Sequence, residues 1–179
     1  MLQILYSSPL KPGAISNGYS SLGGYVSGTQ FQNNDPHLFP WVIEDKINPD
    51  NFKALFIKNL LNSPVTLNLW TPECEGYDFE LSLVQPASHP SCNCPWIETI
   101  YSVESPPLVS EFQKYTEQDK LVQSIPGGGV LGLWIKRRDL RSFGNFNQTG
   151  ILGEGVWGEL KELSQKRLQT TSFSLIIDY

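Results

Sequence analysis

The chain has 179 residues, of which 40% are hydrophobic, 12% aromatic and only 17% charged. Disordered chains have few aromatic residues and a high charge, so this composition excludes disorder and indicates a folded protein. The net charge of −5 provides no global positive field to attract nucleic acid, and we expect no nucleic-acid partner. The basic run Lys136-Arg137-Arg138, followed by Arg141, is interpreted as a solvated strand end.

Strand signals dominate the first 70 residues. The apolar run Leu2–Ser7 ends at a Ser-Ser-Pro break, and Leu22–Gly28 follows a loop rich in Gly, Ser and Asn. Lys53–Asn59 has the pattern of a buried strand, and Val65–Trp70 alternates apolar with polar residues until its last pair. The turn residues Asn62-Ser63-Pro64 lie between these two segments, which predicts a hairpin or two neighbouring strands.

Three later segments continue this pattern. Phe79–Leu83 alternates with period two, so Phe79, Leu81 and Leu83 are expected to face the core. Val130–Lys136 is apolar on both faces, as in a central strand, and Ser172–Tyr179 is expected to be a closing strand. Strands with one apolar face need a second layer, so the predicted fold class is all-β: an antiparallel β-sandwich, Ig-like or jelly-roll-like, with long loops.

Two regions depart from a plain sandwich. Pro36–Asn51 carries Phe39 and Trp41 between prolines, and we expect a loop that packs on the core. Apolar residues near helical spacing in Trp157–Leu168 predict one short helix near 157–168, inside an insertion at about 144–168. No internal repeat or linker divides the chain, so residues 1–179 are expected to form a single domain.

The N-terminus and the cysteines indicate whether the chain is exported, inserted in a membrane or held by disulfides. Met1–Tyr6 lacks a basic region and a long apolar stretch, so we do not expect a signal peptide. No window approaches the length of an apolar membrane span, and no membrane partner is expected. The three cysteines, Cys74, Cys92 and Cys94, are an odd number, which argues against a disulfide framework.

A metal site is a second interpretation of the cysteines. Cys92-Asn93-Cys94 could supply two zinc ligands, although paired zinc cysteines usually have two or more residues between them. The remaining ligands would have to come from Cys74, His37 or His89 by convergence in space. We therefore predict no metal and no cofactor.

No motif predicts catalysis. Gly127–Gly129 leads into a strand rather than a helix and lacks the lysine of a phosphate-binding loop, so it is interpreted as a turn. His37 and His89 lie beside prolines and away from any nucleophile motif. A hydrolase that pairs Cys94 with His89 stays open as an alternative. The leading prediction is that the protein is not an enzyme.

The tryptophans supply the candidate contact residues. Trp70 and Trp134 lie within strand patterns, where packing in the core is the default. Trp41 and Trp96 lie in Pro-rich segments that we interpret as loops, and they are the candidates for a contact surface. Packing of the same rings onto the domain is the alternative for both residues.

The order and spacing of the strand segments resemble a group of uncharacterised virion structural proteins of tailed bacteriophages. The segments that carry this resemblance are Ile4–Ser8, Ser21–Ser27, Leu38-Phe39-Pro40, Lys53–Asn59, Leu67–Trp70, Ser102–Pro107, Gly129–Arg137 and the final strand.

The resemblance implies a β-sandwich component of a virion, and it brings no catalytic residue with it. The chain departs from the pattern at Cys92-Asn93-Cys94 and at Gly144–Leu168. The expected function is that of a head- or tail-associated adaptor, collar, decoration or fibre-attachment protein. Such a protein would be made in the host cytoplasm and would assemble in symmetric multiple copies with other virion proteins. The alternative is a carbohydrate-binding β-sandwich module used for attachment, with Trp41 or Trp96 as the stacking platform.

Overall fold

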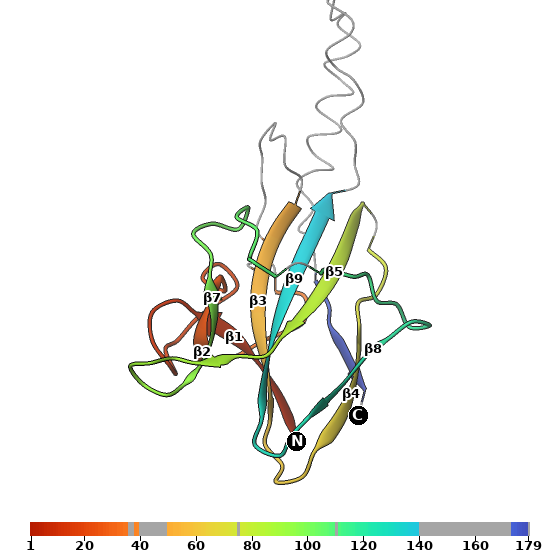
Figure 1. The fold of residues 1–179 in the computed structure, drawn as a ribbon. Coiled ribbons are helices and arrows are strands. Elements are labelled where there is room, and N and C mark those ends of the chain that lie inside the picture. Colours follow the sequence, from red (N-terminus) through yellow and green to blue (C-terminus); the bar gives the residue numbers. More distant parts are fainter. Residues whose placement is uncertain (36–37, 40–49, 75, 110, 140–172, 179) are drawn as a thin grey trace, which may run out of the picture.

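The computed structural model describes residues 1–35, 38–39, 50–74, 76–109, 111–139 and 173–178. Within these ranges the chain is all-β, contains no helix and pairs its strands antiparallel (Figure 1). This confirms the predicted fold class. The strands are β1 Leu2–Ser8, β2 Gly23–Gln30, β3 Asp50–Asn59, β4 Val65–Trp70, β5 Tyr77–Val84, β6 Ala87–Ser88, β7 Pro95–Thr99, β8 Leu121–Ile125, β9 Val130–Asp139 and β10 Ile176–Asp178.

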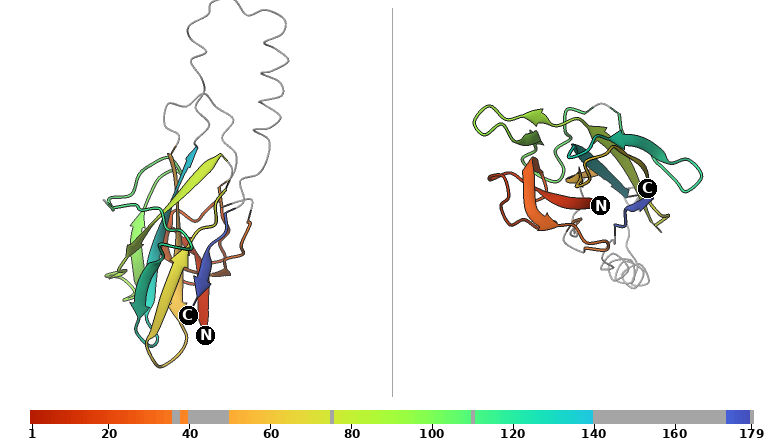
Figure 2. Two further views of the ribbon diagram at one scale, coloured as in Figure 1. Left: turned by 90° about the vertical axis from the view of Figure 1, so that its right-hand side faces the viewer. Right: turned by 90° about the horizontal axis from the view of Figure 1, so that it is seen from below.

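The strands form a large and a small sheet. The large sheet has seven strands in the order β5-β9-β3-β1-β2-β7-β6, and the small sheet has three in the order β10-β4-β8. The large sheet curls, so that β7 returns toward the face of β3 and β9 (Figure 2). Gly132 on β9 permits this approach, because a Cβ there would lie 2.8 Å from Cγ2 of Ile97 on β7.

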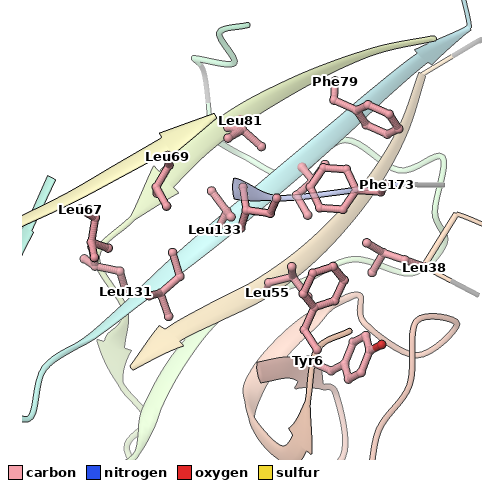
Figure 3. Packing of buried hydrophobic residues seen from close by; sticks show 14 of the residues in the cluster. Tyr6, Leu38, Leu55, Leu67, Leu69, Phe79, Leu81, Leu131, Leu133 and Phe173 are labelled. Atoms are coloured by element: carbon pink, nitrogen blue, oxygen red, sulfur yellow. The ribbon is translucent and has the colours of Figure 1, made fainter. Parts of the chain in front are cut away.

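β3 and β9 form the centre of the large sheet and are apolar on both faces. Alternate side chains such as Leu55 and Leu133 enter a main core between the two sheets (Figure 3). Their neighbours Phe56 and Trp134 enter a second core inside the curl of the large sheet. Each of these four side chains is 0% exposed. Full burial of such a side chain contributes about 1.5–3 kcal/mol, so both faces stabilise the fold.

The chain crosses between the sheets twice at one end of the molecule. β3 lies in the large sheet and β4 in the small sheet, so the hairpin alternative is wrong; the two are successive strands joined by residues 60–64. β8 and β9 make the second crossing through the turn that contains Gly127–Gly129, which confirms the turn interpretation. Buried Asn59 joins the two crossings, because its amide nitrogen donates to the carbonyls of Ser63, Ile125 and Pro126 at 2.8–3.2 Å.

Other sequence predictions have mixed outcomes. Leu38 and Phe39 are 0% and 1% exposed, which confirms that this part of the predicted loop packs on the core. The closing strand is shorter than predicted, since it begins only at Ile176. The helix near 157–168 and the insertion at 144–168 lie outside the described residues.

Candidate contact surface

Trp96 is the candidate contact residue that the structure describes. It lies in strand β7 and not in a loop, so that part of the prediction was wrong. Tyr25 of β2 is its direct partner across the pair, and Ala87 of β6 is its partner on the other side. Ile97 beside it is buried in the second core, whereas Trp96 lies on the opposite, outward face and is partly exposed.

Three partly exposed rings come together at this position. The His89 ring lies with its centroid 5.1 Å from that of Tyr25 and 6.0 Å from that of Trp96. Both pairs are edge-to-face, which is a favoured geometry for aromatic contacts. We call Tyr25, His89 and Trp96 the aromatic trio. Sequence reasoning missed two of its members, because Tyr25 and His89 are far apart along the chain and only strand pairing brings them together.

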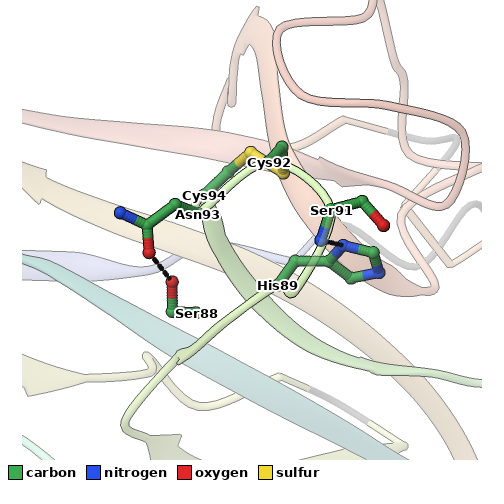
Figure 4. The surroundings of a disulfide bond; sticks show 6 residues. All are labelled: Ser88, His89, Ser91, Cys92, Asn93 and Cys94. Atoms are coloured by element: carbon green, nitrogen blue, oxygen red, sulfur yellow. Dashed lines mark hydrogen bonds between the residues drawn. A yellow bond between two sulfur atoms is a disulfide. The ribbon is translucent and has the colours of Figure 1, made fainter.

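A tight loop after β6 holds His89 in place (Figure 4). The amide of His89 donates to the carbonyl of Cys94 at 2.9 Å, and the amide of Asn93 donates to the carbonyl of His89 at 2.8 Å. The amide of Ser91 donates to Nδ1 of His89 at 3.2 Å. Asn93 has a φ of 53°, a left-handed conformation that asparagine tolerates better than most residues. The loop therefore fixes both the backbone and the ring of His89.

A disulfide joins Cys92 and Cys94 within this loop, a single bridge between near neighbours that the argument against a disulfide framework did not anticipate. The third cysteine, Cys74, lies outside this bridge. In the structure the two sulfurs bind each other, so they are not available as zinc ligands and Cys94 has no thiol to pair with His89. Across the described residues no group of three or more His, Cys, Asp or Glu side chains is placed to hold a metal ion.

The other tryptophans divide between core and surface. Trp134 is 0% exposed, which confirms its predicted core position. Trp70 is partly exposed at the end of β4, and the ammonium of Lys120 lies 4.2 Å above its ring. Trp41, Trp157 and His37 lie outside the described residues.

In the described part of the basic run, Lys136–Arg138, the side chains do not form a free cationic patch; Arg141 lies outside the described residues. The Lys136 ammonium lies 2.8 Å from the Glu80 carboxylate and 3.6 Å from Asp50. The Arg138 guanidinium lies 3.0 Å from Asp50, whose hydrogen bond and charge raise the pKa of Arg138 above its usual value. Strand alternation directs Arg137 to the opposite face, where it is 5% exposed.

Two buried cations lie on the main-core face, and sequence reasoning missed both. Lys53 is 1% exposed and donates to the carbonyls of Gly18 and Tyr19 at 2.6 and 2.8 Å. Burial lowers the pKa of Lys53 to about 7, although the Asp35 charge opposes this shift. Arg137 donates to the carbonyl of Phe39 at 3.3 Å and to the side-chain oxygen of Asn51 at 3.0 Å. The carbonyl contacts of Lys53 anchor the loop that precedes β2.

Comparison with known proteins gives no assignment: no protein-family model, no curated protein and no solved structure matches the chain. In the part of the chain that the structure describes, no helix is long and apolar enough to cross a membrane.

Proposed function

We propose that this protein is a structural component of a tailed-phage particle and that it acts through protein–protein contacts. The observation that carries the proposal is the aromatic trio, which presents three partly exposed rings from a rigid sheet and a closed loop. Tyrosine and tryptophan are enriched at binding hot spots, because they contribute a large contact area at a low cost in side-chain entropy. The order of strand segments along the chain supports the virion assignment.

The trio is suited to binding rather than to chemistry. The Nδ1 atom of His89 already accepts a backbone hydrogen bond, and its neighbour Cys94 is in a disulfide. The carboxylate of Glu98 on β7 accepts a hydrogen bond from the backbone amide of Leu108 at 2.6 Å. These side chains are engaged in contacts that hold the surface in place, and we propose that the protein is not an enzyme.

Purified particles test this function. The protein should be found in them by mass spectrometry in repeated copies, and Trp96→Ala should reduce its copy number while the variant still folds. Trp70→Ala is the matched control, because Trp70 is another partly exposed strand tryptophan outside the trio. Absence of the wild-type protein from particles would refute the virion role. Equal incorporation of the Trp96 variant would refute the role of the trio.

A carbohydrate-binding role is the second candidate, and polar groups in the loop that carries His89 favour it. The side chains of Ser88 and Asn93 hydrogen-bond to each other in this loop, and both residues are exposed (Figure 4). Sugar sites combine an aromatic stacking face with hydrogen-bonding groups of this kind. Specific binding on a glycan array that is lost in Trp96→Ala and kept in Trp96→Phe would support this candidate over a protein partner.

A further inference from the structure

The edges of the two sheets differ in how well they are covered. β6 has only two residues and lies between Pro86 and Pro90. β5 is covered at Leu81, which exchanges backbone hydrogen bonds of 2.8 and 3.1 Å with Gln113. Short strands, prolines and covering segments are the usual ways to prevent edge-to-edge association, so both edges of the large sheet are protected.

The small sheet has one protected edge and one open edge. β10 has three residues, and the side chain of Asn33 makes hydrogen bonds of 3.0 and 3.3 Å with the backbone of the preceding Leu175. β8 lies at the opposite edge, beside β4 (Figure 1). Within the described residues β8 pairs with β4 alone, and the partly exposed Gln123 side chain donates to the Ser124 carbonyl at 3.0 Å.

The sequence of β8 offers none of the usual protection. Leu121-Val122-Gln123-Ser124-Ile125 contains no charge, no proline and no glycine, and its register with β4 runs without a bulge. Val122 is 59% exposed on the outward face of the small sheet, opposite Asn68 of β4. An open, uncharged strand with an exposed apolar side chain is a template for a further strand.

We propose that β8 is the interface between two copies of this chain, which join their small sheets by antiparallel β8–β8 pairing about a two-fold axis at Gln123. The segment is self-complementary in this register. Leu121 lies opposite Ile125 of the second copy and Val122 lies opposite Ser124. One position further out, Lys120 faces Pro126, so no like charges oppose each other. This match of residues across a two-fold axis favours a second copy of the chain over an unrelated strand.

The two-fold register brings the Val122 side chains of the two copies onto one face as diagonal neighbours. Diagonal Cβ atoms in an antiparallel pair are about 7–8 Å apart or somewhat less, within reach of long side chains. Pairing therefore covers an exposed valine and gives partners to the backbone groups on the edge of β8 away from β4. A strand of five residues buries little area, so the dimer is weak and needs a high local concentration.

Sedimentation equilibrium of the full chain over a wide concentration range tests the interface. The wild type should associate as a dimer. Val122→Lys and Val122→Glu should each raise the dissociation constant by about tenfold or more, since like charges then approach across the axis. An equimolar mixture of the two variants should recover association, because the introduced charges are then opposite. This recovery also shows that both variants fold.

Ile176→Lys is the matched control, because Ile176 is 37% exposed on the same outward face but lies on the β10 edge. It should associate like the wild type. A wild type that stays monomeric throughout, a mixture that fails to recover, or an Ile176 variant that is equally impaired would overturn the proposal. The inference does not rest on the virion role, since particle mass spectrometry and sedimentation give separate answers.

Discussion

Both faces of the β3–β9 pair carry basic side chains at the same end of the molecule, but the surroundings of these side chains differ. On the face inside the curl, Lys136 and Arg138 are partly exposed and meet the carboxylates of Glu80 and Asp50. On the face between the sheets, Lys53 is buried and donates hydrogen bonds to the carbonyls of Gly18 and Tyr19. Pairing with Asp50 raises the pKa of Arg138, so this cation keeps its charge. Burial lowers the pKa of Lys53 to about 7, so this lysine loses its proton near neutral pH. A lysine is therefore a surface charge or a core group according to which face of the strand its position directs it to.

The largest expected effect concerns the apolar centres of the two faces. Leu133→Ala in the main core and Phe56→Ala in the second core should each lower the free energy of unfolding by about 2–5 kcal/mol, because both residues are 0% exposed. Denaturant titration measures both changes. A cost below about 1 kcal/mol for either variant would show that its face is not a packed core.

The buried lysine should give the stability an unusual pH dependence. Lys53 has a pKa of about 7 in the folded protein and 10.5 in the unfolded chain, so the unfolded state binds more protons between these values. Its contribution to the free energy of unfolding should rise with pH above 7, with a slope of up to about 1.4 kcal/mol per pH unit.

Lys53→Met should remove this slope. The difference between the two proteins in free energy of unfolding separates the contribution of Lys53 from that of other titrating groups. The stability measurements should stop below the pH range in which the tyrosines ionise. Burial raises the pKa of Tyr6 and Tyr115 in the folded protein, so their ionisation makes stability fall with rising pH. Parallel curves for the wild type and the variant would contradict a lowered pKa for Lys53 in the folded protein.

The ion pairs on the other face should contribute less. Glu80→Gln should cost about 1 kcal/mol at low salt, because Glu80 contacts both Lys136 and Arg138 in a partly exposed network. The cost should shrink as salt is added, since screening weakens exposed pairs. Stability measured in two salt concentrations checks this, and an effect that is independent of salt would contradict it.

The smallest effect is expected at the loop of the aromatic trio. Replacing Cys92 and Cys94 together by serine should change the global stability by under about 1 kcal/mol, because the bridge closes a very short loop at the surface. Binding by the trio should fall more than stability, as the loop that positions His89 loosens. Thermal unfolding and partner binding of the same variant separate the two effects.

Strand alternation in the sequence predicted much of the fold. Segments such as Lys53–Asn59 and Val130–Lys136 carry many bulky apolar residues, so their burial could be inferred directly. β7 and β8 were missed because each has five residues of mixed polarity and β7 begins at a proline. Burial of Lys53 follows from its parity with Leu55 and Ile57, a signal that was present in the sequence but was outweighed by the charge of the residue.

The candidate site was less predictable than the fold. Trp96 was identified from its residue type, but its partner Tyr25 comes from a distant strand that pairing brings beside it, and His89 reaches it through the fold of the β6–β7 loop. The disulfide was not anticipated, because a cysteine count says nothing about which two sulfurs meet in a closed loop. Local patterns determine strands, whereas contacts between distant residues determine the site.

Electron microscopy of an intact particle would locate this protein and test the role of the aromatic trio. We expect repeated copies whose Tyr25, His89 and Trp96 side chains are covered by a neighbouring subunit. Copies that leave these three rings in solvent, or particles without the protein, would contradict it.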